Sequence, residues 1–419
     1  MKARPGAEFV RRSRHFTCRG CQNQGLEPVL DFGHMPASDR FLNQDELSEP
    51  EPRYPLELAF CGHCSLLQIL ETVDPQLLFG ENYVYYSSYS DSWLTHSQTS
   101  ASDITGRYGL DENSLVVELA SNDGYLLQFF KQRGVLVLGI DPAPGPAAAA
   151  GDKGIETINQ FFTTRLAEEL RAEGVRADVV VTKNVLAHVA DIHDFIQGID
   201  VILKPEGAWV IEVPYVRDLV EGGAFDTIYH EHLCYFSVKA LQQLLARHHL
   251  TINEIRRLDS HGGSLRLHVG RNSHVNESVT RLLEEECNAG LHRVDYYQDF
   301  AGRVVETSAS ISALLEHLAA QGYHIAAYGA AAKGTMLLNC LGKAARHVAY
   351  AVDRNSFKQG KWIPGVQIPI LPPDTIISDR PDYLLLLPWN LQHEILAQQQ
   401  SYRDRGGKFI IPLPAPRIV

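Results

Sequence analysis

Two Cys-x-x-Cys pairs near the N-terminus, Cys18/Cys21 and Cys61/Cys64, have the spacing of metal ligands. Each turn can direct two thiolates at one ion, and two turns complete a tetrahedral Cys₄ zinc site with no position for water. The long loop between the turns is a weak objection, since each doubling of loop length costs only about 0.6 kcal/mol. Structural zinc contributes about 10–16 kcal/mol in small peptides. We expect a structural zinc site, with His63 as a weaker competitor for one position.

A second candidate site lies in the middle of the chain, where Val116-Val-Glu-Leu-Ala-Ser-Asn-Asp-Gly-Tyr125 has the order of a strand, a tight turn and the start of a helix. Ala120 and Asn122 stand where a Gly-x-Gly-x-x-Gly loop would have glycines, and only Gly124 remains. A dinucleotide's pyrophosphate needs close backbone approach, which these two side chains partly deny. The loop favours a cofactor without phosphates, such as S-adenosylmethionine; a phosphate-cofactor Rossmann domain is the alternative.

Further polar residues follow strands that should end at the same edge. Asp141 ends the next strand, at a spacing that suits an acid binding ribose hydroxyls. The run Asp178–His188 predicts a strand that ends at the same rim, and Leu203–Glu212 has the turn and strand typical of the fifth strand in class I methyltransferases. Ligands of open α/β sheets bind at the carboxyl ends of the strands. These segments therefore support a cofactor site around the 116–125 loop.

A third candidate site is the turn Gly329-Ala-Ala-Ala-Lys-Gly334, which follows a predicted strand and opens a helix. Its backbone amides and helix N-terminus suit an anion such as a sugar nucleotide's pyrophosphate, and Lys333 adds a positive charge. A plain turn with a solvated lysine is the alternative. Asp353 ends the next strand and is a candidate for a ribose or base contact, and Lys358 and Gln359 are further candidates for nucleotide contacts.

Length, charge and cysteine content limit the class of protein. A chain of 419 residues exceeds one ordinary core, so two or three domains are expected. The net charge of -12 argues against duplex nucleic acid as a partner. There is neither an apolar run of about 20 residues for a membrane helix nor a secretory h-region at the N-terminus. Four of the seven cysteines form the two pairs, which favours metal binding in a reducing cytoplasm over disulfides.

Alternating apolar and amphipathic stretches predict two α/β units. The expected strands are Leu115–Leu119, Val135–Ile140, Asp178–Thr182, Ala208–Val213, His324–Gly329, His347–Val352 and Tyr383–Leu387. The expected helices are Gly124–Arg133, Arg165–Ala172, Thr335–Leu341 and Gln392–Gln399.

The segments between these units have characters of their own. The stretch Val279–Leu318 has helical spacing and predicts one long helix, or two, leaving the central domain. An aromatic and hydroxyl-rich segment, Asn82–Ser90, connects the cysteine-containing part to the first α/β unit. The Pro/Ala-rich stretch Pro142–Gly151 is expected to be a loop.

With these motifs in order, the chain resembles the S-adenosylmethionine-dependent C-methyltransferases of nucleotide-linked deoxysugars, which make 3-C-methyl branched sugars. The resemblance extends over nearly the full length, and several separate motifs make it specific. One departure is Ser356, where the family would have proline, and it puts no catalytic position in doubt. The motifs are Cys18-Arg-Gly-Cys21 with Pro28-Val-Leu-Asp-Phe-Gly-His-Met-Pro36, Cys61-Gly-His-Cys64 before Leu67-Gln68, Glu118-Leu-Ala-Ser-Asn-Asp-Gly124, Tyr229-His-Glu-His232 with Tyr235-Phe-Ser237, Tyr328-Gly-Ala-Ala-Ala-Lys-Gly334 and Val352-Asp-Arg-Asn-Ser-Phe-Lys-Gln-Gly360.

The resemblance implies a class I, Rossmann-like methyltransferase domain (residues 81–272) between a zinc-binding domain (14–80) and a C-terminal Rossmann-like domain (273–419). The sugar nucleotide would lie between the domains. By similarity, the cofactor loop from Glu118 through Ala120 to Gly124 holds S-adenosylmethionine, together with the polar residues Asn122, Asp141 and Asn184. Tyr229-x-Glu-His232 matches the family's catalytic segment, with His232 as the general base.

The chemistry of such a reaction agrees with these residue types. Methylating carbon requires a carbanion equivalent, which a 4-keto sugar supplies when a base removes the proton from the adjacent carbon. Histidine has an unperturbed pKa suited to that step, and Glu231 could orient the imidazole of His232. Tyr83, Tyr229 or His188 could stabilise the resulting enolate.

Plainer interpretations of the same residues stay open. The 229–236 segment could be a turn with alternating buried aromatics, or His230 and His232 could bind a metal. His188 could be a helix cap, and Tyr83 could serve interdomain packing.

The sequence thus predicts a cytoplasmic C-methyltransferase acting at C-3 of a nucleotide-linked 4-keto-deoxysugar, in antibiotic or polysaccharide biosynthesis. It would need no nucleic acid or membrane partner, and the three-domain layout could work as a monomer. The rival interpretations are a sugar-nucleotide oxidoreductase that uses the C-terminal unit, a non-catalytic binding module, and a methyltransferase acting on another ketone.

Overall fold

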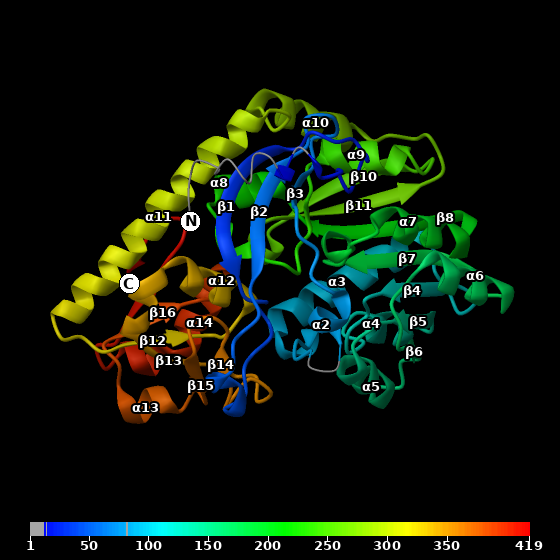
Figure 1. The fold of residues 1–419 in the computed structure, drawn as a ribbon. Helices are drawn as coiled ribbons and strands as arrows, with labels where there is room; N and C mark the ends of the chain where they lie inside the picture. Colours follow the sequence, from blue (N-terminus) through cyan, green and yellow to red (C-terminus); the bar gives the residue numbers. More distant parts are fainter. Residues whose placement is uncertain (1–11, 14, 81–82) are drawn as a thin grey trace.

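The computed structural model describes residues 12–13, 15–80 and 83–419, and three sheets divide the chain (Figure 1). A small antiparallel sheet belongs to the N-terminal part, and each of the two later α/β units is built on a seven-stranded sheet. This is the fold class that the sequence predicts. Asn82, at the start of the aromatic segment, lies outside the described residues.

The N-terminal sheet has the order β1-β2-β3-β9, and all its neighbours are antiparallel. Its last strand comes from much later in the chain, from the segment that contains the predicted base. Leu67 pairs with Tyr235, and Gln68 pairs with Cys234. The cysteine-containing part and the catalytic segment are therefore joined through one sheet. The strands are β1 Glu27–Met35, β2 Tyr54–Phe60, β3 Leu67–Ile69 and β9 Cys234–Tyr235.

The middle sheet has the order β10-β11-β8-β7-β4-β5-β6. Its five strands from β8 to β6 are parallel, and β11 and β10 extend the β8 edge antiparallel, which the sequence did not predict. The parallel strands are runs of Val, Leu and Ile because helices cover both faces. The strands are β4 Leu115–Leu119, β5 Leu136–Ile140, β6 Thr157–Ile158, β7 Ala177–Lys183, β8 Leu203–Pro214, β10 Thr251–Leu258 and β11 Ser264–Gly270.

The helices of the first two parts correct one expectation. The stretch 142–151 is not a loop: most of it forms helix α5, Pro144–Asp152. Proline is tolerated in the first helical turn, and the following alanines have the highest helix propensity. The other helices here are α2 Pro75–Phe79, α3 Asp91–Tyr108, α4 Leu127–Lys131, α6 Thr164–Ala172, α7 Ile192–Ile202, α8 Val216–Glu221 and α9 Val238–Ala246, with 3₁₀ turns η1 Asp45–Ser48, η2 Ser87–Tyr89, η3 Leu186–His188, η4 Phe225–Thr227 and η5 Ser260–Gly262.

Two helices, α10 Glu277–Ala289 and α11 Val294–Ala320, connect the α/β units. The sequence predicts either one long helix or two here, and the structure has two. In Figure 1 the yellow helix α11 runs along one side of the molecule, from the methyltransferase unit to the C-terminal unit. Its buried stripe includes Tyr297, Phe300 and Ile311, so one face packs against the body of the protein.

The C-terminal sheet has the order β14-β15-β13-β12-β16-β17-β18, with a parallel centre from β15 to β17. Antiparallel strands β14 and β18 close its two edges. The strands are β12 Ile325–Tyr328, β13 Val348–Val352, β14 Trp362–Ile363, β15 Ile368–Leu371, β16 Tyr383–Leu386, β17 Lys408–Ile411 and β18 Arg417–Ile418. The helices are α12 Ala332–Cys340, α13 Thr375–Asp379, α14 Gln392–Gln398 and α15 Gln400–Arg403, with 3₁₀ turns η6 Gly342–His347 and η7 Trp389–Leu391.

The N-terminal part also contacts the C-terminal unit directly. The hairpin of β1 and β2, blue in Figure 1, runs between the two α/β units, and the loop beyond it meets β14. Leu42 and Trp362 exchange two backbone hydrogen bonds of 3.0 and 2.9 Å. The Glu51 carboxylate accepts from the amide of Gly365. Among the residues that the structure describes, no helix is both long enough and apolar enough to cross a membrane.

Candidate functional site

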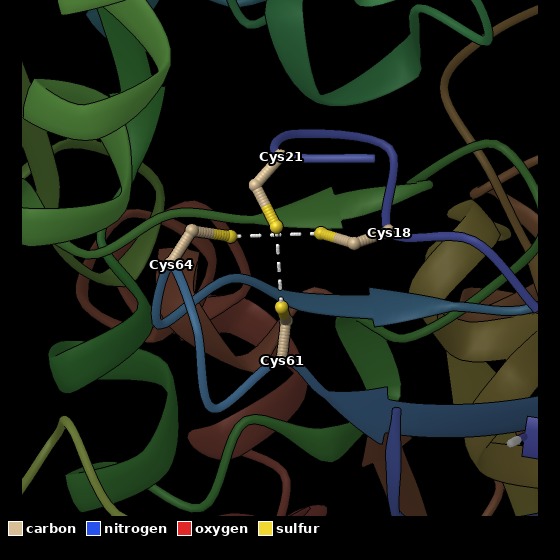
Figure 2. A group of neighbouring side chains, drawn as sticks. All are labelled: Cys18, Cys21, Cys61 and Cys64. Atoms are coloured by element: carbon tan, nitrogen blue, oxygen red, sulfur yellow. Dashed lines mark hydrogen bonds between the residues drawn. The ribbon is translucent and has the colours of Figure 1, made fainter. Parts of the chain in front are cut away.

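The four cysteines of the two pairs meet in one buried cluster (Figure 2). The sulfur atoms of Cys18 and Cys64 lie 3.5 Å apart, as do those of Cys21 and Cys61. All four sulfurs are within 4.8 Å of one another. Tetrahedral zinc with Zn–S bonds of about 2.3 Å requires S···S separations of about 3.8 Å. The donor set therefore fits a structural Cys₄ zinc site, and His63 is exposed.

Both Cys-x-x-Cys turns have the same local geometry. In each turn the residue after the second cysteine has a left-handed backbone, with φ of 60° at Gln22 and 62° at Ser65. That residue's amide donates to the carbonyl of the first cysteine at 2.8 Å in both turns. Side-chain amides of Gln68 and Asn23 donate to the sulfurs of Cys18 and Cys21, which supports thiolates in the cluster.

The cofactor loop has the backbone of a glycine-rich turn without its glycines. Ala120, Asn122 and Gly124 have φ values of 56°, 50° and 72°, all in the left-handed region. Glycine adopts this region freely and asparagine tolerates it, whereas alanine is strained there, at a cost of about 1 kcal/mol. The missing glycines therefore did not change the path of the chain.

The Asp141 carboxylate holds this loop in place. One oxygen accepts from the Asn122 amide at 2.8 Å, and the other accepts from the Ala143 amide at 2.9 Å. Burial raises the pKa of Asp141 to about 6, although these two amides oppose the shift. Gly139 in the same strand allows close approach, because a Cβ there would lie 2.5 Å from the Ser121 hydroxyl oxygen.

The predicted cofactor residues line the carboxyl ends of β4, β5 and β7. Within residues 12–13, 15–80 and 83–419, both carboxylate oxygens of Glu118 and the side-chain oxygen of Asn184 are buried and make no direct hydrogen bond, although the Tyr125 hydroxyl lies close enough to Glu118 to oppose the rise of its pKa. Burial raises the pKa of Glu118 well above its usual range, and Lys183 opposes this shift. Unpartnered buried acceptors at the ends of adjacent strands fit a ligand with ammonium and hydroxyl donors, as the expected S-adenosylmethionine has. The side-chain amide of Asn122 is instead used by the aromatic segment: it accepts from the Ser87 amide.

A buried ionic cluster, which the sequence did not predict, supports the same strand ends. The Glu212 carboxylate lies 3.1 Å from the Lys183 ammonium and 3.3 Å from the Arg266 guanidinium. Its third partner is the His96 imidazole. Lys183 also lies over the Trp93 ring, 5.2 Å from its centroid. In this cluster the single Glu212 carboxylate offsets part of the charge of Lys183 and Arg266.

The predicted catalytic residues come together at the junction of the three parts. The rings of His188 and His232 have centroids 4.8 Å apart, and those of Tyr229 and His232 are 4.2 Å apart. Phe79 packs edge-on against both His188 and Tyr83. Residues from three separate stretches thus form one aromatic cluster.

The hydrogen bonds of His232 define its tautomer. Its Nδ1 lies 2.7 Å from the Thr227 carbonyl oxygen, and its Nε2 lies 3.1 Å from the Tyr229 hydroxyl. A carbonyl can only accept, so Nδ1 carries the proton and Nε2 offers a lone pair. The Thr227 carbonyl therefore orients the imidazole, a role that the sequence suggests for the carboxylate of Glu231.

The neighbouring groups are held neutral. Burial lowers the pKa of His188 to about 4, so its imidazole is uncharged near neutrality and is a weak base. Burial also raises the pKa values of Tyr229 and Tyr83 well above their usual range, so both stay phenols that can donate. A single oriented base beside neutral donors is an arrangement suited to removing a proton next to a carbonyl.

Glu231 contacts the N-terminal part. Its Oε1 accepts from the Asp39 amide at 3.3 Å, and its Oε2 is buried without a partner. Burial, and then the nearby Asp39 carboxylate, raise the pKa of Glu231 to about 8. His230 is also structural, since its Nε2 lies 3.1 Å from the Pro55 carbonyl oxygen. Within the described part of the chain, the four cysteines are the one group of three or more residues arranged to hold a metal, so His230 and His232 do not form such a site.

The C-terminal candidates surround a second loop. The Lys333 ammonium donates to Asn390 at 3.0 Å and lies 4.8 Å from the centroid of the Trp389 ring. Asp353 accepts from the Ala330 amide at 2.6 Å and from the Asn355 amide at 2.8 Å.

Lys358 and Gln359 are mainly tied to this loop. The Lys358 ammonium donates to the Ala330 carbonyl at 2.8 Å and lies over the Phe41 ring. The Gln359 amide donates to the Asp353 carbonyl at 2.9 Å.

Two carboxylates near the site were missed from the sequence. Asp39 touches Glu231, and Asp226 precedes the catalytic segment and accepts from Trp389. Asp39 lies shortly after the 28–36 motif and Asp226 shortly before the 229–232 motif. Nothing in the local sequence marks either residue, and only their contacts with distant parts of the chain show that they lie near the site.

Three family models match the chain, each over one of its structural parts. A zinc binding domain matches residues 18–79, a methyltransferase domain matches residues 93–255, and a C-methyltransferase C-terminal domain matches residues 259–414.

A curated relative matches almost the whole chain. The C-methyltransferase NovU of Streptomyces niveus is 35% identical over 405 residues, which cover 96% of each chain. A ubiquinone biosynthesis O-methyltransferase of Azorhizobium caulinodans is 29% identical over 112 residues, covering 25% of this chain and 44% of the relative. A solved magnesium protoporphyrin IX methyltransferase from Synechocystis PCC 6803 with bound S-adenosylmethionine is 17% identical, with a TM-score of 0.33, and covers 43% of this chain and 82% of that chain.

Proposed function

Because the chain belongs to the family of C-methyltransferases that includes NovU, an S-adenosylmethionine-dependent family with a zinc-binding domain, we propose a specific reaction for it. The enzyme transfers a methyl group to C-3 of a nucleotide-linked 4-keto-deoxysugar through an enolate, with His232 as the base, in the biosynthesis of a branched sugar. Membership of this family argues against the oxidoreductase and the non-catalytic module.

The hydrogen bonding of His232 is the observation that carries this proposal. The Thr227 carbonyl holds Nδ1–H, so the basic Nε2 is directed to the Tyr229 hydroxyl in a half-buried cluster. Neutral His188 and Tyr83 complete the cluster. An O- or N-methyltransferase can use a nucleophile that the substrate already has, whereas methylation at carbon requires such a base to create one.

The surroundings of the cluster support an anionic, nucleotide-linked acceptor. Lys333 and Lys358 lie on the C-terminal unit, near the N-terminal and catalytic segments that form the cluster. The Lys333 ammonium has one hydrogen bond, to the amide of Asn390, among the residues that the structure describes, and other donor positions suit phosphate oxygens.

The residues would act in the following order. Tyr83 and His188 donate to the keto oxygen; the Tyr229 hydroxyl, which donates to Nε2 of His232 in the free enzyme, turns to the keto oxygen as Nε2 takes the C-3 proton, and the C–H electron pair is delocalised as the enolate. The Thr227 carbonyl stabilises the imidazolium that forms. When bound, S-adenosylmethionine supplies an electrophilic methyl group. His232 later releases its proton to solvent.

The test is incubation of the protein with S-adenosylmethionine and a panel of nucleotide 4-ketosugars in deuterated water. We expect one class of acceptor to gain a methyl group at C-3, and that position to exchange with deuterium when the cofactor is omitted. The variant His232→Ala should lose both activities by about 10²–10⁴-fold. The matched control is His317→Ala, on the exposed face of α11, which should behave as wild type.

Two outcomes would contradict the proposal. Undiminished deuterium exchange in His232→Ala would remove His232 as the base. Methylation of a ketone that carries no nucleotide, with every nucleotide ketosugar inert, would remove the acceptor class.

A further inference from the structure

Asp226 lies immediately before the Thr227 carbonyl that orients the base, and its side chain is completely buried. The turn that contains it, η4, packs against α12 of the C-terminal unit. The indole Nε1 of Trp389, also from the C-terminal unit, donates to Oδ2 of Asp226 at 2.7 Å. The hydrogen bond from Trp389 of the C-terminal unit is therefore made to Asp226, the residue next to Thr227, whose carbonyl accepts from His232.

The ring of the same indole contacts Lys333, a residue of the predicted anion site. The Lys333 ammonium lies 4.8 Å from the Trp389 ring centroid. Donation of the indole N–H to a carboxylate increases electron density on the ring, which strengthens its attraction for the cation. Burial lowers the pKa of Lys333, and the Asp226 charge opposes that shift. Asp226, Trp389 and Lys333 thus form one electrostatic unit that spans two domains.

The path from this unit to the base is short and continuous. Residues Phe225–Thr227 form a single 3₁₀ turn, which is closed by bonds from the Thr227 amide and hydroxyl to the Ala224 carbonyl. Movement of Asp226 would therefore displace the neighbouring Thr227 carbonyl, 2.7 Å from Nδ1 of His232. Misplacement of a catalytic group by about 1 Å can reduce a rate about 100-fold.

We propose that Asp226 is a positioning residue: by holding Trp389 of the C-terminal unit, it fixes the Thr227 carbonyl and so aligns His232 for proton removal. This inference rests on the proposed role of His232 as the base. It also gives the C-terminal unit a part in catalysis besides binding, because the indole N–H of Trp389 contacts Asp226 while its ring contacts the predicted phosphate ligand Lys333. In the described part of the chain, Oδ1 of Asp226 has no direct hydrogen-bond partner, whereas Oδ2 accepts from Trp389 and the Lys333 ammonium attracts the carboxylate electrostatically.

The first test observes the imidazole directly and needs no substrate. In the full-length protein labelled with ¹⁵N-histidine, the Nδ1–H of His232 should give a slowly exchanging downfield proton signal, assigned by its loss in His232→Gln. We expect Asp226→Ala and Trp389→Phe to weaken or lose this signal. Asp226→Asn keeps an oxygen that can accept from Trp389, and it should retain the signal. The exposed Asp374→Ala is the control.

The second test separates positioning from binding. Asp226→Ala and Trp389→Phe should lower kcat and the rate of deuterium exchange at C-3 by roughly 10- to 100-fold, while the Kd for S-adenosylmethionine stays unchanged. Asp226→Asn should recover most of the lost kcat. A purely structural defect would instead reduce cofactor binding and the melting temperature in proportion to the rate.

Either of two results would overturn the inference. One is an unchanged His232 signal with wild-type kcat in both Asp226→Ala and Trp389→Phe. The other is a loss of cofactor binding that parallels the loss of rate. If wild type methylates no ketosugar, the proposed function fails, but the imidazole signal still decides whether Asp226 positions His232.

Discussion

The two α/β units fasten their first loops to the neighbouring strand with the same pair of hydrogen bonds, but the charged side chains near the two loops differ. In the methyltransferase unit, Asp141 at the end of the second strand accepts from an amide of the first loop and from the amide two residues after itself. In the C-terminal unit, Asp353 at the end of the second strand makes the same pair of bonds. Each carboxylate thereby fastens the first loop of its unit to the neighbouring strand.

The side chains on the two loops differ in sign. The first loop follows the buried carboxyl of Glu118, whereas the second carries Lys333. S-adenosylmethionine has a net positive charge, and a nucleotide diphosphate is negative. The backbone arrangement is common to both units, and we expect charged side chains such as Glu118 and Lys333 to determine which ligand each unit suits.

Removing zinc should produce the largest difference between the two units. Chelation should unfold the N-terminal part, because structural zinc contributes on the order of 10–16 kcal/mol in small peptides. Strand β3 pairs with β9, so the catalytic segment should loosen and methyl transfer should be lost. Binding of S-adenosylmethionine, measured by calorimetry, should persist because its loop does not contact the cysteines. Loss of both together would show that the cofactor unit depends on zinc.

Exchanging each fastening carboxylate for an amide should affect only its own unit. Asp141→Asn and Asp353→Asn each replace one acceptor of a backbone amide, at a cost of roughly 1–3 kcal/mol. We expect a 10- to 100-fold weaker Kd for S-adenosylmethionine in the first variant and a similarly raised KM for the nucleotide sugar in the second. The exposed Asp152→Asn is the control. Equal effects of both variants on both ligands would show that the two carboxylates do not act separately on the two units.

Removing the charge from the second loop should have a smaller effect. Lys333→Met keeps much of the side-chain volume but loses the ammonium, so the KM for the nucleotide sugar should rise about tenfold, as a lost charged hydrogen bond predicts. The affinity for S-adenosylmethionine should stay constant. Lys343→Met, an exposed position of the same unit, is the matched control. An unchanged KM would mean that phosphate binds elsewhere.

The smallest effect should be a dependence of cofactor affinity on pH. Burial raises the pKa of Asp141 to about 6. A cationic ligand binds better beside a carboxylate, so affinity should decrease a few-fold between pH 7.5 and pH 5. The contribution to folding has the opposite sign: a raised pKa stabilises most below about pH 4, and this stabilisation is lost as pH rises through 6. Titration calorimetry at both pH values tests the first trend, which Asp141→Asn should reduce.

Local sequence patterns predicted much of this structure. The strand at Leu115–Leu119 has the predicted bounds, and the helix at Thr164–Ala172 begins one residue earlier than expected. The strand is set by its run of apolar residues, and the helix is set by its hydrophobic periodicity and by the N-cap Thr163 that precedes it. Most of the stretch 142–151 is a helix and not the predicted loop, because proline is compatible with a first helical turn and the alanines that follow favour a helix.

Residue type and spacing alone predicted the Cys₄ cluster and the position of the cofactor loop, and the resemblance to the family marked His232 as the candidate base. These follow from chemistry within short segments, and a resemblance over the full length placed them in one enzyme. The tertiary structure decided which groups act on them: the Thr227 carbonyl on His232, Asp39 beside Glu231, and Trp389 on Asp226. Such contacts join residues from different domains or depend on the exact turn of the backbone. Their energies come from burial and geometry that no local pattern records.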